Sequence, residues 1–147
     1  MRLLSFALLF CFIFSSCGGD DKKVALSNNT GAAKFDSAAL TSIEWLDSAN
    51  RDFGKIPEGK KLDVSFRFRN SGDKPLIIKR VQPSCGCTVA EQPAEPIMPG
   101  KEGVIKASFN SENRVGPNHK TLYVLANTRQ SQTSELHFQV EVEKKKW

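Results

Sequence analysis

The chain has 147 residues, of which 39% are hydrophobic and 25% are charged, and its formal net charge is +5. This is the balance of an ordinary globular protein, and it excludes a disordered chain of high charge and low hydrophobicity. The length provides for one domain with additional segments. A single hydrophobic core is therefore expected.

The first residues have the features of an export signal. A positive start is followed by an apolar run over residues 3–14, which is too short for the ~20 residues that a membrane-spanning helix needs. Two serines then directly precede Cys17, a pattern that resembles the lipobox at which the thiol is acylated and the chain is cut. We expect residues 1–16 to be a lipoprotein signal peptide; the alternative is a plain secretory signal beside an unrelated cysteine.

An acylated Cys17 would attach the chain stably to membrane lipid, because a diacyl-type anchor supplies the two signals that stable attachment requires. The residue after the cysteine is Gly18 rather than an aspartate. This resembles the pattern that permits onward transfer to the outer membrane. We therefore expect a lipid-anchored protein of the cell envelope, at the outer membrane, on its periplasmic face or at the cell surface. An exported chain also argues against a nucleic-acid partner.

Residues 17–42 are rich in small and polar amino acids and show no sustained periodicity, which predicts that the acylated cysteine is followed by a flexible tether. Ser37 and Ser48 each lie in an Asp-Ser-Ala tripeptide, which matches a short O-glycosylation acceptor of some Gram-negative bacteria. The alternative is that both are chance tripeptides in a region rich in Ser and Ala.

The clearest strand pattern lies at residues 62–69, where apolar side chains alternate strictly with polar or charged ones. This is the period of a half-buried strand. Residues 70–75 are rich in turn-forming amino acids, and residues 76–81 then return in an extended pattern. We expect these two strands to form a hairpin.

Further short strands are expected at residues 43–46, 53–59, 104–109, 122–126 and 136–142. Pro57 confines the second of these to a sheet edge. The pattern predicts an all-β fold, an immunoglobulin-like β-sandwich of about seven strands over residues 43–143, with a partly open barrel as the alternative. A basic tail, residues 144–147, follows. The inward-facing residues expected in the core are Leu62, Val64, Phe66, Phe68, Ile105, Phe109, Leu122, Val124, Phe138 and Val140.

Four ordered motifs carry a resemblance to a known family: DFGxIxEG at residues 52–59, FxFxNxGxxPLxI at 66–78, SCGCT at 84–88 and PGxxGxI at 99–105. Together they resemble the bacterial lipoproteins grouped as domain-of-unknown-function family 1573, over residues 43–142. The resemblance implies an immunoglobulin-like sandwich of the Hydin or major-sperm-protein kind on an exported protein. It implies no reaction.

Cys85 and Cys87 are the residues of the sequence that most clearly indicate a specific chemistry. Two cysteines retained in an exported protein are expected to pair, to bind a metal or to do redox work. Residues two apart in a straight strand lie about 6.6 Å apart, too far for a disulfide, so a bridge needs a turn, for which Gly86 supplies backbone freedom. A metal site would need two more ligands, and only His119 and His137 could provide them; His137 is expected on the face opposite Phe138.

Arg67, Arg69, Lys79 and Arg80 are close to the same predicted hairpin in the sequence. They could form a basic patch for an acidic glycan or a lipid headgroup. The alternative is a solvated sheet face with edge-protecting lysines.

The sequence contains no phosphate-binding loop, no His-Glu-x-x-His and no Gly-x-Ser-x-Gly motif. We therefore expect no enzyme activity, no cofactor and no resident metal. The favoured function is a membrane-anchored binding or scaffolding module whose loops and edge strands engage an envelope protein or glycan. The alternative is an envelope thiol redox or metal-handling module that uses the Cys-Gly-Cys loop.

Overall fold

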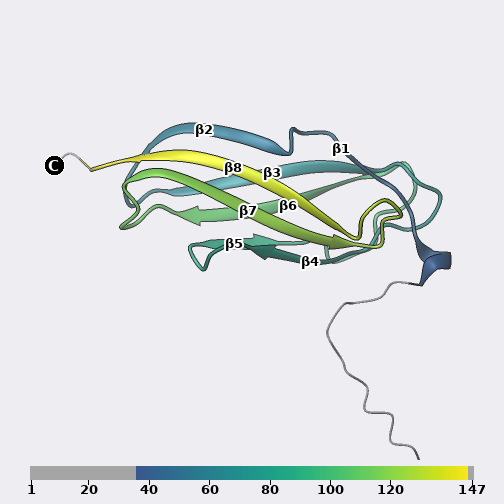
Figure 1. Cartoon of the computed structure of the whole chain (residues 1–147). Coiled ribbons are helices and arrows are strands. Elements are labelled where there is room, and N and C mark those ends of the chain that lie inside the picture. Colours follow the sequence, from purple (N-terminus) through teal and green to yellow (C-terminus); the bar gives the residue numbers. More distant parts are fainter. Residues whose placement is uncertain (1–35, 146–147) are drawn as a thin grey trace, which may run out of the picture. The chain divides into compact units, whose positions relative to one another are not determined.

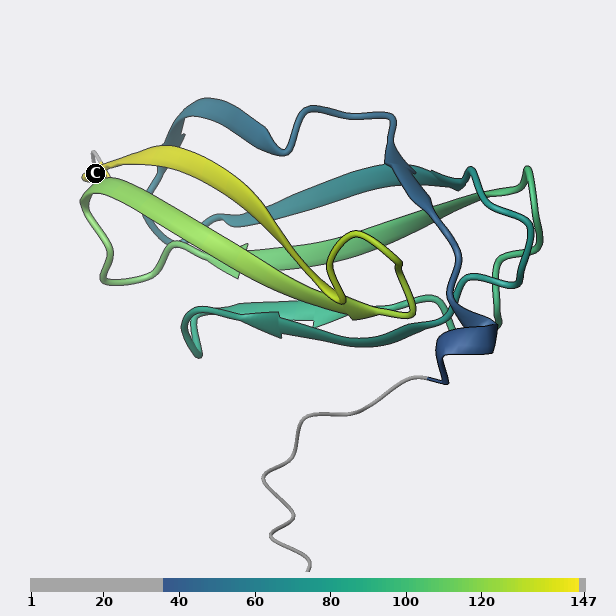
Figure 2. The same cartoon turned by 45° about the vertical axis from the view of Figure 1, so that its right-hand side comes forward.

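The computed structural model describes residues 36–145, which form two stacked β-sheets of four strands each (Figures 1 and 2). The strands are β1 (Ile43–Trp45), β2 (Asn50–Pro57), β3 (Lys61–Asn70), β4 (Ile78–Pro83), β5 (Thr88–Glu91), β6 (Glu102–Asn110), β7 (Gly116–Ala126) and β8 (Thr133–Glu143). A short 3-10 turn, η1 (Ser37–Ala39), precedes them. The all-β sandwich predicted from the alternating patterns is confirmed.

One sheet, which we call the β3 sheet, has the strand order β1-β3-β6-β5, and the other, the β7 sheet, has the order β2-β8-β7-β4. Neighbouring strands are antiparallel except for β2 and β8, which are parallel. The chain passes between the sheets at β1–β2 along one pair of edges and at β4–β5 along the other. Both lateral sides of the sandwich are therefore joined by a covalent crossing.

Each of the seven predicted segments contains a strand, and Pro57 ends β2 at a sheet edge, as expected. The eighth strand, β5, was not predicted. It has four residues, and a segment that short contains too few alternations to stand out from a loop.

The predicted hairpin is wrong. β3 pairs with β1 and β6, whereas β4 pairs with β7 in the opposite sheet. The physical reason lies in the connection: Asn70, expected at the start of an exposed turn, is fully buried. Leu76 and Ile78 are also buried, so the chain crosses the end of the sandwich from one sheet to the other.

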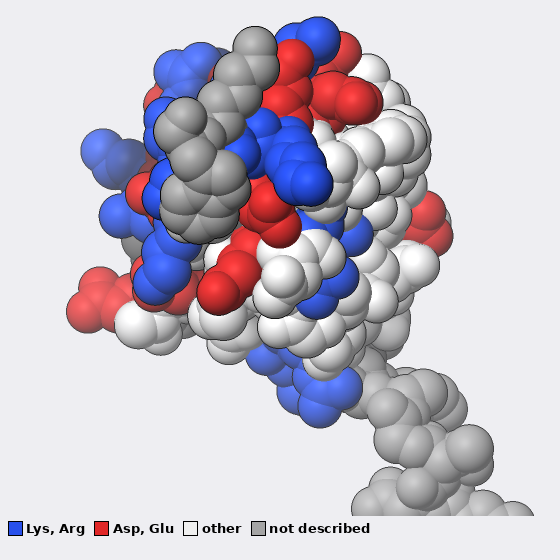
Figure 3. Space-filling model, turned by 90° about the vertical axis from the view of Figure 1, so that its left-hand side faces the viewer, with Lys and Arg blue, Asp and Glu red and all other residues white. Residues whose placement is uncertain are grey.

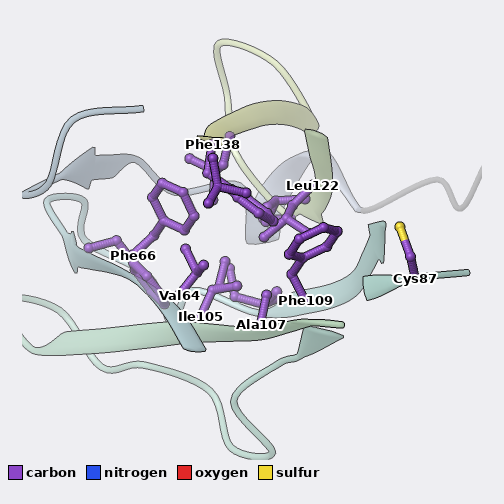
Figure 4. Close-up of a cluster of buried hydrophobic side chains, with 14 of the residues drawn as sticks. Val64, Phe66, Cys87, Ile105, Ala107, Phe109, Leu122 and Phe138 are labelled. Carbon is purple, nitrogen blue, oxygen red and sulfur yellow. The ribbon is translucent and has the colours of Figure 1, made fainter. Parts of the chain in front are cut away.

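The core lies between the sheets. Figure 4 shows Phe66, Phe109, Leu122 and Phe138 converging on one another, with Cys87 at one side of the cluster. The rings of Phe109 and Phe138 meet edge to face, with centroids 6.3 Å apart. Nine of the ten predicted core residues are buried, and Leu62 is half-buried. Each such side chain contributes about 1.5–3 kcal/mol of transfer free energy.

The folded domain begins before residue 43. Thr41, which was assigned to the tether, is fully buried and forms a parallel bridge with Thr128. The last residues of the predicted tether are therefore part of the sandwich.

The predicted signal peptide, Cys17 and most of the tether lie outside the described residues, as do the last two residues of the basic tail. Within residues 36–145, no helix has the length and apolar character needed to cross a membrane.

Candidate functional site

A shallow groove runs along the outer face of the β7 sheet. It consists of two adjoining depressions of about 430 Å³ each, which share Asp52, His119 and Gln139. These residues occupy one row across β2, β8 and β7, and Thr121 and His137 occupy the next row. We call the five side chains and the space between them the polar groove. They face outward because the alternate residues on the same strands, Leu122 and Phe138 among them, are buried.

Asp52 is held in place by two hydrogen bonds. The backbone N–H of Gly54 donates to its Oδ1 at 2.8 Å, and Nε2 of Gln139 donates to its Oδ2 at 2.9 Å. The Gly54 N–H, then the Gln139 amide, and to a lesser degree the charge of His119 lower the pKa of Asp52 below its ordinary value. The carboxylate is therefore ionised at neutral pH, and it fixes the Gln139 side chain beside it.

His137 is also held in place. Its Nδ1 lies 3.0 Å from Oγ1 of Thr121 on the neighbouring strand, and its Nε2 lies 3.6 Å from a carboxylate oxygen of Glu135. The predicted position of His137 on the face opposite Phe138 is confirmed, since Phe138 is 2% exposed. Both histidines line the polar groove rather than completing a site with the cysteines. In the part of the chain that the structure describes, no three His, Cys, Asp or Glu side chains form a group that could hold a metal ion.

Cys85 and Cys87 form a disulfide, one of the alternatives that the sequence left open, with the two Cα atoms 5.4 Å apart. The bridge lies where the chain crosses from β4 to β5. Cys87 belongs to the buried core and Cys85 packs against it. Backbone bonds fix both residues: the Thr88 N–H donates to the Cys85 carbonyl at 3.3 Å, and the Asn110 N–H donates to the Cys87 carbonyl at 2.9 Å. This environment gives no support to a thiol redox or metal-handling module, because Cys87 is buried in the core and sulfurs joined in a disulfide are not thiolate ligands.

Gly86 does not supply the backbone freedom that the sequence suggested. It does not have a positive φ, unlike four other glycines of the domain. A Cβ atom placed on it would meet no heavy atom within 4 Å. The turn that brings the two sulfurs together can therefore be made by any small residue.

The four predicted patch residues are divided between the two sheets. Arg67 and Arg69 lie on β3, and Lys79 and Arg80 lie on β4 in the opposite sheet, because the hairpin that would have joined them does not exist. Arg67 forms an ion pair with Asp47 at 2.9 Å, and its hydrogen bonds hold the pKa of that carboxyl below its usual value.

Arg69 forms an ion pair with Glu102 at 2.7 Å. Ion pairing of this kind is what a solvated, charge-balanced face would show. Figure 3 shows a similar mixture on the end of the domain where the chain leaves β8, with Lys and Arg interspersed with Asp and Glu.

The two predicted glycosylation serines are both exposed. Ser37 begins η1. Ser48 lies in the β1–β2 crossing, where its hydroxyl donates to the Asn50 carbonyl at 2.8 Å and accepts from the Asn50 N–H at 3.2 Å. Modification of either serine stays a prediction.

Sequence reasoning identified the two histidines but missed Asp52, Thr121 and Gln139. The signal for Thr121 and Gln139 was present, since both occupy outward positions of alternating strands. Asp52 enters the groove only because β2 pairs in parallel with β8, about 85 residues along the chain. No local pattern carries that pairing.

Solved structures with a similar fold define the class of protein. A protein of unknown function from Porphyromonas gingivalis is 17% identical, with a TM-score of 0.61 over 73% of this chain and 49% of its own. The VesB protease of Vibrio cholerae is 11% identical, with a TM-score of 0.53 over 71% of this chain and 32% of its own. A PapD-like domain of human CEP192 is 10% identical, with a TM-score of 0.50 over 77% of this chain and 92% of its own. At these identities the likeness shows the fold alone, an immunoglobulin-like, PapD-like β-sandwich.

Residues 43–142 match the family described as "Protein of unknown function (DUF1573)", and the chain belongs to this family. The four motifs had indicated the same family over the same residues. No curated protein matches the sequence. The chain spans about half the length of the Porphyromonas gingivalis protein.

Proposed function

We propose that this chain is a lipoprotein of the cell envelope, anchored at Cys17, whose sandwich is a binding or scaffolding module for an envelope protein or glycan. Within its fold class we place the domain with the Hydin and major-sperm-protein kind, and we propose a binding role rather than a catalytic one. The sequence of residues 1–17 supports the anchor. The polar groove is the observation that carries the binding role.

The groove suits a polar partner because its side chains are already ordered. Asp52 is hydrogen-bonded to Gln139, and Thr121 is hydrogen-bonded to His137. All four residues lie on strands of one sheet. A partner that binds here would lose less free energy to side-chain ordering than it would on a surface of mobile side chains. The groove offers both donors and acceptors, the combination that sugar hydroxyls and peptide groups require.

The sheet edges are less suited to binding than the sequence suggested. β2 has an irregularity between Asp52 and Lys55 and ends in Pro57, and β4 has one between Ile78 and Arg80. The other two edge strands, β1 and β5, have three and four residues. Bulges, proline and short length are the means by which sheets prevent strand addition. We therefore propose the outer face of the β7 sheet as the binding surface, in place of the edges.

The anchor is tested by replacing Cys17 with Ala. The variant should move from the membrane fraction to the soluble fraction and should lack the mass of the acyl chains. A variant that stays membrane-bound with an unchanged mass would refute the anchor and would leave the binding role untouched.

The binding role is tested with the soluble Cys17→Ala chain, which is sedimented with envelope fragments that lack the protein. The added changes His119→Ala and Gln139→Ala should reduce the sedimented fraction. Ser65→Ala, on the outer face of the β3 sheet, is the matched control and should leave that fraction unchanged. Equal losses from both sets of changes would argue against the groove.

A further inference from the structure

Directly after η1, the chain's own residues 40–42 lie in extended form against two loops at one end of the sandwich. The Thr41 N–H donates to the Asn127 carbonyl at 2.9 Å, and the Arg129 N–H donates to the Thr41 carbonyl at 2.9 Å. On the other side, the Ser71 N–H donates to the Ser42 carbonyl at 3.1 Å. This alternation of donors and acceptors, with an isolated parallel bridge between Thr41 and Thr128, is the hydrogen bonding of a short strand, made here to the backbone of loops.

Side chains of the two loops bind the same segment. Asn127 donates through Nδ2 to the Ala39 carbonyl at 2.7 Å, and Arg129 donates through Nε to the Leu40 carbonyl at 3.2 Å. The backbone of residues 39–42 is thus bound at every position.

One side chain of the segment is bound as well. Oγ1 of Thr41 donates to Oδ1 of Asn70 at 3.0 Å, and Thr41 is 0% exposed. The remaining capacity of the Asn70 amide is used by the Lys74 and Ile97 carbonyls and by the Gly72 N–H. Since every polar group of Asn70 has a partner, its amide is fixed in the orientation that accepts the threonine hydroxyl.

Gly72 leaves just enough room for this segment. A Cβ atom on Gly72 would lie 2.2 Å from Oγ1 of Thr41 and 2.6 Å from the Ser42 nitrogen. Only glycine leaves room for the segment at this point. The FxFxNxGxxPLxI motif thus contains both the amide that binds Thr41 and the glycine that admits it.

We infer that this end of the domain is a strand-binding groove for an extended peptide with a small hydroxyl residue at its buried position, and that its occupant is the chain's own segment Ala39–Ser42. Covalent linkage gives the segment an effective concentration of about millimolar or more, so the groove is filled in cis. Among residues 36–42, the described part of the predicted tether, this segment makes hydrogen bonds to the sandwich, and the groove fixes its path before β1. The inference rests on the described residues and does not depend on the anchor at Cys17.

Hydrogen exchange on the full chain tests the occupancy. The amides of Ser71 and Arg129 donate to the segment, so they should be protected in the wild type. Thr41→Val keeps the shape but loses the bond to Asn70, and it should speed exchange of these two amides about threefold to tenfold. Ser42→Ala is the matched control, because the Ser42 hydroxyl makes no hydrogen bond within residues 36–145, and it should change nothing.

Unprotected Ser71 and Arg129 amides in the wild type would overturn the inference. So would a Thr41→Val chain in which the core strands exchange faster by the same factor, since that would show a general loss of stability rather than release of the segment.

A second measurement tests whether the groove is a separable site. Thr41→Pro removes the N–H that donates to Asn127, and it should eject the segment in the full chain. A labelled peptide of residues 36–42, capped at both ends, should then bind this variant and should not bind the wild type, whose groove is filled. A folded Thr41→Pro chain that ignores the peptide would overturn the inference. Equal binding to both chains would contradict occupancy in cis, and if Thr41→Pro fails to fold, the exchange pattern of Thr41→Val decides.

Discussion

Replacing Phe66 with Ala should be among the most destabilising single changes in the domain. Phe66 is 0% exposed, lies midway along β3, and belongs to the buried cluster drawn in Figure 4. Truncation removes the transfer free energy of the ring and leaves a cavity, together about 3–5 kcal/mol. The guanidinium of Arg51, 5.9 Å from the ring centroid, would also lose one of its two aromatic partners.

A domain of this size is expected to have a free energy of unfolding of about 5–15 kcal/mol. The change would therefore remove a large fraction of it. Urea unfolding can be followed by the fluorescence of Trp45, whose ring lies edge-on to Phe68 with the centroids 5.7 Å apart. The midpoint should fall while the slope stays the same, because the surface exposed on unfolding is unchanged.

Asp63→Ala is the matched control for this change. Asp63 lies on the same strand but on the outward face, where it is exposed. Its replacement should alter the free energy of unfolding by less than about 0.5 kcal/mol. Equal effects from Phe66→Ala and Asp63→Ala would refute the register of β3, and with it the assignment of the core.

Three further changes test other parts of the structure. Gly103→Ala should cost about 1–3 kcal/mol in the same urea experiment, because the new Cβ atom would lie 2.5 Å from the buried ring of Phe68; Gly86→Ala, which meets open space, should be nearly silent. Replacing both disulfide cysteines with alanine should cost only about 1.6 kcal/mol, the loop-entropy value for a three-residue ring, and a loss above about 4 kcal/mol would contradict this reasoning. Because Arg67 lowers the pKa of Asp47 in the folded state, the stability from this carboxylate is present above its unfolded pKa of about 4 and is lost as the pH falls through the folded value. Asp47→Asn should therefore lower the urea midpoint at pH 7, and the loss should shrink as the pH falls below about 4; a loss that does not change with pH would refute the ion pair.

The alternating patterns predicted where strands occur because that information is local. The side chains of residues 62–69 alternate whether or not a neighbour is known, and the structure buries three of their four apolar members and half-buries the fourth. The pairing of strands is not local. Turn-forming residues at 70–75 are equally compatible with a tight hairpin and with a crossing between sheets, and the buried amide of Asn70 decides for the crossing.

The candidate site was predictable only in part for the same reason. The two histidines were noticed as possible metal ligands, but their neighbours on the polar groove come from β2, β7 and β8. The parallel pairing of β2 with β8 joins residues far apart in the sequence. The cysteines were predicted to need a turn, and the structure has one at the β4–β5 crossing. The strand order shows that this crossing closes one side of the sandwich. No sequence motif indicates that strand order.

The proposed binding surface is tested most directly by crosslinking from a defined position in living cells. A photoreactive amino acid would replace His119 in the polar groove or, as a control, Asp63 on the outer face of the β3 sheet, in the full-length chain. If the polar groove is the binding surface, position 119 should give a discrete crosslinked species that is absent from position 63 and that is lost when Gln139→Ala is added. Crosslinking from position 63 alone, or with equal yield from both positions, would contradict the assignment of the groove as the binding surface.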